Sequence, residues 1–240
     1  AGLGWIGKHT NLIDPQFGSF VFLGEIVTTV AFDSDERLKK NCGSCRRCID
    51  ICPTGALRGD YTIDATRCIS DLTQRTDGIP RAMRPFIGTW VWGCDLCQTI
   101  CPPTEKAGLS TRPDNSAISQ DAAAPSLVRL LRLRSSEFRR TFAPTAIGWR
   151  GAAVLRRNAA VALGNALDRS TVSALCDALE SDPHPMVRGH AAWALGRIGS
   201  PAAIDALEKR LGRESSQSAR EEIAFALEPY ASSGALWRME

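Results

Sequence analysis

Nine cysteines carry the clearest chemistry in this sequence, and eight of them fall between residues 42 and 101. Four stand in CGSCRRCIDICP, residues 42–53, at the spacing C-x2-C-x2-C-x3-C-P. In runs of this kind the first three thiolates hold one four-iron cluster, and the fourth thiolate ligates a neighbouring cluster. The run therefore predicts two iron–sulfur clusters that lie close together.

A shorter copy, CDLCQTICP, follows at residues 94–102 and lacks the first cysteine. Cys68, in DATRCIS, is the one unassigned cysteine near it. Eight thiolates then serve two clusters. We expect the first cluster to be held by Cys42, Cys45, Cys48 and Cys101, and the second by Cys52, Cys68, Cys94 and Cys97.

Zinc is the alternative metal, because C-x2-C pairs also build zinc ribbons and knuckles. A zinc site has no use for three cysteines at successive x2 spacings or for the C-x3-C-P ending. Disulfides are disfavoured because the chain shows no export signal. The ninth cysteine, Cys176 in VSALCDALE, lies on the apolar face of a predicted helix, where we expect a core residue.

The elements around the cysteines predict a ferredoxin-like domain over residues 36–106. Pro53 and Pro102 follow the last cysteine of each run and turn the chain away from a helix there. Upstream, FGSFVFLGEIVTTVAF (17–32) is rich in aromatic and β-branched residues, which predicts a strand buried on at least one face. One strand does not make a domain. We therefore expect residues 1–35 to be the end of a larger α/β unit, and the chain to be a fragment.

Residues 107–125 are rich in Pro, Ser, Asp and Ala without a period, which predicts a linker. Residues 126–240 have an almost wholly helical pattern that repeats at a shift of 32: RRNAAVALGN (156–165), RGHAAWALGR (188–197) and REEIAFALEP (220–229). Three copies of a helical pair predict a short HEAT-like α-solenoid. The predicted fold class is α+β, mostly α.

Arginine dominates the start of this helical region. The net charge of the whole chain is only +3, but residues 129–157 hold eight arginines and a single acid, Glu137. Arginine among aromatic residues suits phosphate contact and base stacking, so this stretch predicts a nucleic-acid surface. The alternative is a solvated helix face whose aromatics pack on the rest of the protein. The candidate RNA contacts are Arg132, Arg134, Arg139, Arg140, Arg156 and Arg157.

Several pieces together resemble the epoxyqueuosine reductase family: AGLGWIGKHTNLI, FGSFVFLGEI, CGSCRRCIDICPTGAL, DATRCIS, GCDLCQTICP and the terminal repeats. The resemblance covers essentially all 240 residues, but not the N-terminal part of that family. It implies the same eight cluster ligands, a cobalamin-binding α/β domain of which residues 1–35 are a remnant, and tRNA facing the basic start of the solenoid. The implied reaction reduces epoxyqueuosine to queuosine in tRNA, the last step of queuosine biosynthesis, with electrons passing through two [4Fe-4S] clusters to cobalamin.

Within that resemblance, four residues are candidate cobalamin contacts: Lys8, Asn11, Thr76 and Arg81. The chain also departs from the family in three places. The family's catalytic aspartate lies upstream of AGLGW, so we expect no catalytic residue here and no activity from this fragment alone. His9 stands where asparagine is expected in GKNT, and CPPT (101–104) replaces CPWN. Neither replacement touches a predicted cluster ligand.

Two other functions would use the same cysteines. An iron–sulfur electron-transfer protein needs neither an upstream α/β remnant nor arginine-rich repeats. Another corrinoid-dependent reductase, such as a reductive dehalogenase, usually carries an export signal and no HEAT-like tail. No run reaches the roughly 18 consecutive apolar residues of a membrane helix. We therefore expect a cytoplasmic monomer that binds tRNA and an electron donor such as a flavodoxin or ferredoxin, and no membrane.

Overall fold

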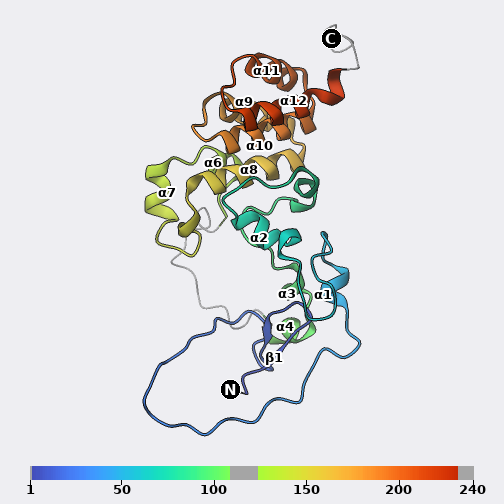
Figure 1. Cartoon of the computed structure of the whole chain (residues 1–240), viewed down its shortest axis with the longest axis vertical. Coiled ribbons are helices and arrows are strands. Elements are labelled where there is room, and N and C mark those ends of the chain that lie inside the picture. The colour runs from blue at the N-terminus through green and yellow to red at the C-terminus, as the bar shows by residue number, and fades with distance from the viewer. Residues whose placement is uncertain (1, 109–123, 232–240) are drawn as a thin grey trace. The chain divides into compact units, whose positions relative to one another are not determined.

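The computed structural model describes residues 2–108 and 124–231, which form two compact units (Figure 1). Among the described residues, the cysteine unit comprises 2–71 and 94–108, and the helical unit comprises 72–93 and 124–231. Each unit is thus built from two separate stretches of the chain. The predicted linker, 107–125, falls mostly outside the described residues.

Short elements joined by turns make up the cysteine unit. Strands β1 (Trp5–Ile6) and β2 (Leu12–Ile13) pair antiparallel, with Trp5 opposite Ile13. The helices and helical turns are α1 (Arg47–Asp50), η1 (Ala65–Arg67), the start of α2 (Ile69–Gln74), α3 (Leu96–Thr99) and α4 (Pro102–Ala107). The positions of the cysteines are therefore set by turns and helix ends.

The predicted strand at residues 17–32 is not formed. Residues 19–40 run as an open loop, drawn in blue in Figure 1, without a strand partner among the described residues. Phe22, Ile26 and Val27 are all more than nine-tenths exposed. An apolar, β-branched composition favours a strand only where a neighbour satisfies its backbone groups and covers its side chains. Neither condition is met in the part of the chain that the structure describes.

A two-layered repeat array forms most of the helical unit. Its helices are α8 (Ala152–Ala166), α9 (Val172–Ser181), α10 (Pro185–Ile198), α11 (Pro201–Leu211) and α12 (Gln217–Ala231). α10 lies between α8 and α12, while α9 and α11 pack against α10 and against each other (Figure 1). Three short segments precede the array: α6 (Leu127–Leu131), α7 (Ser135–Thr141) and η4 (Gly148–Arg150). None of the described helices is long and apolar enough to cross a bilayer.

The 32-residue repeat places equivalent residues at equivalent contacts. A methyl group added to Gly164 would meet Ala194 at 2.8 Å, and one added to Gly196 would meet Ala226 at 2.8 Å. These two glycines therefore allow α8, α10 and α12 to approach closely. The predicted solenoid is confirmed, and its spacing depends on small residues at repeated positions.

Residues 72–93, which the sequence placed within a domain over 36–106, pack in the helical unit instead. Asn158 of α8 is fully buried and donates to the carbonyls of Thr73 and Val91, both at 2.7 Å. Buried backbone carbonyls need donors, and here the repeats supply them. That is the physical reason why this segment joins the solenoid rather than the cysteines that flank it in sequence.

Two further side chains of the repeats hold the same segment, which contains η2 (Arg81–Ile87). Glu222 of α12 accepts two hydrogen bonds from buried Arg84, at 2.7 and 2.8 Å. His190 of α10 accepts a hydrogen bond from the Ile79 N–H at 3.1 Å. Burial lowers the pKa of His190 well below 6.5, and the positive charge of Arg84 lowers it further. His190 is therefore a neutral structural residue.

Candidate functional site

The first predicted cluster site is formed by the turn before α1 and the start of α4. The Cys45 N–H donates to the Cys42 carbonyl at 3.1 Å, and Cys48 follows in α1. Cys101 is the N-cap residue of α4, and both Cys48 and Cys101 are buried. Burial raises the pKa of Cys101, and the nearby thiols of Cys42 and Cys48 raise it further. Thiols from two distant runs therefore lie together.

The second predicted site gathers thiols from three places in the sequence. Cys68 ends η1, and Cys97 lies in α3. Burial raises the pKa of Cys97 to about 12, and the thiols of Cys94, Cys68, Cys48 and Cys52 contribute to the rise. Burial also raises the pKa of Cys94, with contributions from Cys68 and Cys52. Because Cys48 belongs to the first group and lies near Cys97, the two groups adjoin.

The donor set fits iron–sulfur clusters. In a [4Fe-4S] cluster each of four thiolates binds a different iron, so the thiols stand around a volume rather than around one atom. In a zinc site, by contrast, every sulfur lies about 2.3 Å from the same ion. Across the described residues, no three His, Cys, Asp or Glu side chains converge as they would around a single metal ion. Eight thiols in two adjoining groups match the ligand number of two such clusters.

Lys8 fixes the turn that carries the first cysteines. Its Nζ donates to the carbonyls of Gly43 at 2.8 Å and Cys45 at 3.0 Å. Lys8 is also a predicted cobalamin contact, and two of its ammonium protons are engaged with this turn. A role of this kind could not be read from the sequence, because the partners lie 35 and 37 residues away.

The sequence did not indicate the contacts made by two threonines beside the cysteines, Thr54 and Thr104. Thr104 is the last residue of CPPT, which stands where the family resemblance led us to expect CPWN. Its hydroxyl accepts a hydrogen bond from the Ser19 N–H at 3.0 Å and so holds the start of the open loop. Buried Thr54 lies 3.5 Å from the Cys52 sulfur. Burial raises the pKa of Cys52, but hydrogen bonds from Thr54 and neighbouring backbone groups outweigh burial and lower it. The one sequence signal for Thr54 was its position two residues after a predicted ligand.

His9, the residue found where asparagine was expected, lies inside the turn between β1 and β2. Its Nδ1 accepts a hydrogen bond from the Asn11 N–H at 3.2 Å. Its Nε2 is buried and has no hydrogen-bond partner within the described part of the chain. Burial lowers the pKa of His9, so the ring is neutral at physiological pH. This replacement therefore keeps the turn at the expense of one unsatisfied polar atom.

The predicted cobalamin contacts are divided between the two units: Lys8 and Asn11 belong to the cysteine unit, and Thr76 and Arg81 to the helical unit. Thr76 is exposed. The Arg81 Nε donates to Glu222 at 3.1 Å. Contact of these four residues with cobalamin stays a prediction.

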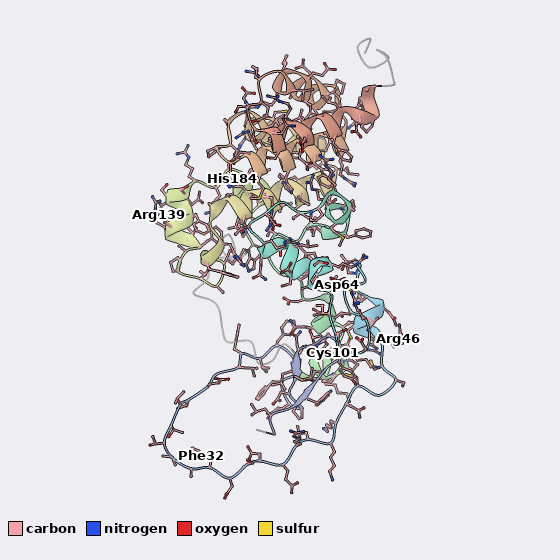
Figure 2. The ribbon with its side chains drawn as sticks, viewed as in Figure 1. Phe32, Arg46, Asp64, Cys101, Arg139 and His184 are labelled. Carbon is pink, nitrogen blue, oxygen red and sulfur yellow. The ribbon has the colours of Figure 1, made fainter. Side chains whose placement is uncertain are left out.

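Four of the six candidate RNA contacts are exposed: Arg132, Arg134, Arg139 and Arg140. Arg139 and Arg140 lie in the last turn of α7, which Figure 2 shows with Arg139 labelled. Arg132 makes an exposed ion pair with Asp177 at 2.8 Å. Arg134, Arg139 and Arg140 make no ion pair with any described residue. These three guanidinium groups can therefore contact phosphate without breaking an internal bond.

The other two candidates, Arg156 and Arg157, are buried, and the prediction that they contact RNA is wrong. Arg156 pairs with Asp182 at 2.6 Å. Arg157 is 0% exposed. Its guanidinium donates to four backbone carbonyls, those of Leu72, Thr73, Arg75 and Asp77. Burial lowers the pKa of Arg157 to about 10, so it stays charged at neutral pH. Both arginines hold the fold.

Comparison with known protein families identifies both units. Residues 41–104 match the 4Fe-4S double cluster binding domain, and residues 150–228 match HEAT repeats. The first range contains all eight cysteines that the spacing assigned to clusters. The second range covers the array from α8 into α12.

Individual relatives agree with these matches. An epoxyqueuosine reductase from Bacillus anthracis is 39% identical over 95% of this chain and 60% of its own length. A structure of epoxyqueuosine reductase from Bacillus subtilis, with a catalytic aspartate loop swung out of the active site, has a TM-score of 0.89 at 38% identity, over 95% of this chain and 61% of that one. A structure of an epoxyqueuosine reductase with an epoxyqueuosine-modified tRNA stem loop has a TM-score of 0.86 at 38% identity, over 95% and 60%.

The chain spans about 60% of the length of these epoxyqueuosine reductases. Across that span, the cysteine pattern, the repeats and the fold all agree with those relatives. This protein belongs to the epoxyqueuosine reductase family.

Proposed function

We propose that this chain is the electron-delivering and tRNA-facing portion of an epoxyqueuosine reductase. The observation that carries the proposal is the gathering of eight thiols into two adjoining groups, within a chain 38% identical to epoxyqueuosine reductases of known structure. In the proposed reaction, the epoxide of epoxyqueuosine in tRNA takes up two electrons and two protons, and an alkene and water result. Two clusters in series suit this reaction because each passes one electron at a time.

The proposed ligands of the first cluster are Cys42, Cys45, Cys48 and Cys101, and those of the second are Cys52, Cys68, Cys94 and Cys97. The electrostatic proximity of Cys101 to Cys42 and Cys48 supports the first set. That of Cys94 to Cys68 and Cys52 supports the second. In each set one ligand comes from the other run, which is the exchange that the C-x3-C-P endings predict.

Cobalamin is the electron acceptor that the family resemblance implies, and we retain it as part of the proposal. Its chemistry would be the reductive opening of the epoxide. The candidate contacts in this chain remain Lys8, Asn11, Thr76 and Arg81. Of these, Lys8 and Arg81 also make internal hydrogen bonds, to Gly43 and to Glu222.

The tRNA partner is supported by the exposed, unpaired arginines of the helical unit and by the relative solved with a tRNA stem loop. Arg134, Arg139 and Arg140 supply charge for phosphate contacts. Trp149 is 63% exposed, and the Arg150 guanidinium stacks 3.6 Å from its ring centroid. An exposed indole beside cations can stack on an unpaired base. We propose that these groups contact the anticodon stem loop.

The test is a chimera in which this chain replaces the matching portion of the Bacillus subtilis enzyme. The chimera is purified anaerobically and given cobalamin, a low-potential reductant and tRNA that carries epoxyqueuosine. We expect the nucleoside to lose one oxygen atom, as measured by mass spectrometry. Replacing Cys97 by Ala should abolish the reaction, because Cys97 is a proposed ligand of the second cluster and is buried near the other thiols.

Two controls separate the outcomes. The parent enzyme shows that the assay works, and Cys176→Ala in the chimera should leave activity unchanged because Cys176 lies in α9, outside both thiol groups. A chimera that assembles both clusters and leaves the nucleoside intact would overturn the proposed substrate. It would favour a role for this chain as an iron–sulfur electron-transfer module.

A further inference from the structure

A run of cations flanks the first two cysteines of the cysteine unit. Residues 37–47, RLKKNCGSCRR, contain five cations and no acid. All five side chains are exposed, and we call them the basic rim: Arg37, Lys39, Lys40, Arg46 and Arg47. Arg46 is labelled beside α1 in Figure 2. The thiol groups and the rim thus belong to the same unit.

The basic rim is only weakly neutralised. Arg46 lies 3.6 Å from Asp50, and Arg47 lies 3.0 Å from Glu105. These four side chains are between 46% and 63% exposed, so the pairs are screened by water and rearrange easily. Arg37 and Lys39 make no ion pair with any residue that the structure describes. The five cations outnumber these two acids, although three further exposed acids, Asp33, Asp35 and Glu36, directly precede the rim.

In the sequence, the rim lies on both sides of Cys42 and Cys45, two proposed ligands of the first cluster. Cys42 and Cys45 are only partly buried, and Gly43 and Ser44 between them are exposed. Lys8 holds this turn from the inside through its bonds to Gly43 and Cys45. Electron transfer between proteins weakens steeply with distance. A rigid ligand turn at the surface is therefore where an external electron can enter.

We propose that the basic rim is the docking surface of an acidic one-electron carrier protein, which reduces the cluster held by Cys42, Cys45, Cys48 and Cys101. This inference rests on the proposed function, because it requires that cluster. When bound, the cluster would accept one electron from the carrier in each encounter, and no bond would form or break. Opposite charges speed the encounter and orient it. A small, charged interface also releases the carrier quickly for the next electron.

RNA is the other polyanion that a cationic surface can bind. The position of the rim in the sequence favours the carrier, because Lys39 and Lys40 precede Cys42 closely and Arg46 and Arg47 follow Cys45 directly. The exposed arginines proposed for tRNA, Arg134, Arg139 and Arg140, belong instead to the helical unit. Binding of RNA by the rim is therefore an outcome against which the proposal is tested.

The experiment uses the cluster-loaded chain and flavodoxin hydroquinone as the acidic donor. The test variant is Arg37→Glu/Lys39→Glu, which leaves the ligand turn intact. The control is Lys209→Glu/Arg213→Glu, which makes the same charge change at side chains that are 67% and 60% exposed in the helical unit. Stopped-flow absorbance gives the second-order rate constant of cluster reduction. A binding titration with the apo chain gives a second readout that does not depend on electron transfer.

We expect the test variant to lower the rate constant at least about tenfold at low ionic strength, and to weaken donor binding to a similar extent. The difference should shrink near 1 M salt, where the screening length falls to about 3 Å. The control should change the rate less than about twofold, and reduction by dithionite should be unaffected in all variants.

Three results would overturn the inference. Unchanged donor rates in the test variant, with clusters intact, would place the carrier elsewhere while leaving the proposed function standing. A loss of tRNA affinity in the test variant, without any change in the donor rate, would make the rim an RNA surface. Failure of the wild-type chain to assemble clusters would overturn the proposed function and this inference together.

Discussion

Arg188 of α10 and Glu214 form a buried two-point ion pair, with distances of 2.8 and 2.6 Å. One repeat earlier, Arg156 of α8 and Asp182 form the equivalent pair, at 2.6 and 3.2 Å. Both partners are displaced by the 32 residues of the repeat. Each acid lies just after a helix: Asp182 follows α9 and Glu214 follows α11. The repeat therefore contains the same buried ion pair twice, and each pair joins α8 or α10 to the turn that follows the next helix in the chain.

Breaking the Arg188–Glu214 ion pair should destabilise the helical unit. We expect Arg188→Leu to lower the free energy of unfolding by about 3–5 kcal/mol, because it leaves the carboxylate of Glu214 buried with fewer donors. The double variant Arg188→Leu/Glu214→Leu should recover part of that loss, since no buried carboxylate is left short of donors. The recovery is incomplete because Arg210 also loses Glu214, its partner at 2.9 Å. Urea denaturation followed by circular dichroism measures both. Lys209→Leu, which breaks an exposed pair with Asp205, should cost less than about 1 kcal/mol. Equal losses for Arg188 and Lys209 would show that burial does not set the strength of these pairs.

The stability of the helical unit should fall below neutral pH because of His190. Its pKa is lowered well below 6.5 by burial, and Arg84 and Arg157 add repulsion to any charge on the ring. The unfolded chain binds a proton near pH 6.5, whereas the folded chain does not. The stability is thus complete above pH 6.5 and is lost as the pH falls below it. Unfolding curves at several pH values measure the slope. His190→Gln should flatten it, and a slope unchanged by that substitution would exclude His190 as its source.

Arg157 should act through stability rather than through RNA binding. Its guanidinium satisfies buried carbonyls from Leu72 to Asp77, so Arg157→Leu removes several donors at once. We expect a loss of about 3 kcal/mol or more, with faster amide hydrogen exchange over residues 72–77. The folded fraction of the variant should keep its tRNA affinity. A fall in affinity without a change in stability or exchange would restore Arg157 to the RNA surface.

The sequence predicted the features that depend on local spacing. The cysteine runs identified both thiol groups because ligand spacing is a property of neighbouring residues. The helical repeat was visible because Ala162, Ala194 and Ala226 recur at a fixed interval. Even Cys68, which lies 26 residues before Cys94, could be assigned because eight thiols must be divided between two clusters.

Features that depend on the environment of a side chain could not be predicted in the same way. Arg139 and Arg157 look alike in a charge count, yet one is exposed and the other is fully buried. Arg157 lies on the face of α8 that packs against residues 72–93, whereas Arg139 of α7 is exposed to solvent. Tertiary packing determines this difference, and the sequence does not show it. The run 17–32 has strand composition, but composition cannot supply a partner strand. The sequence therefore overestimated the RNA surface and the sheet.

Arg139 and Arg140 should contribute to tRNA affinity with little effect on stability. We expect Arg139→Ala/Arg140→Ala to weaken binding of an anticodon stem loop several-fold at low salt. The slope of affinity against salt concentration should also fall, because fewer counterions are released. Fluorescence anisotropy measures both quantities. Arg169→Ala/Arg213→Ala, a matched removal of two exposed arginines elsewhere in the helical unit, is the control. Equal effects of both double variants would mean that affinity follows total charge rather than the α7 surface.

Removing one proposed ligand thiol of the second cluster should distinguish the two clusters. Cys68 comes from neither cysteine run, and its proposed cluster includes Cys94 and Cys97. We expect Cys68→Ala to lose about half of the bound iron and sulfide after anaerobic reconstitution, while the cluster at Cys42 and Cys45 survives. Electron paramagnetic resonance of the reduced protein should then show one cluster without the magnetic coupling of a pair. Cys176→Ala is the matched control and should keep all of the iron. Full iron content in Cys68→Ala would assign the fourth ligand of the second cluster to another residue.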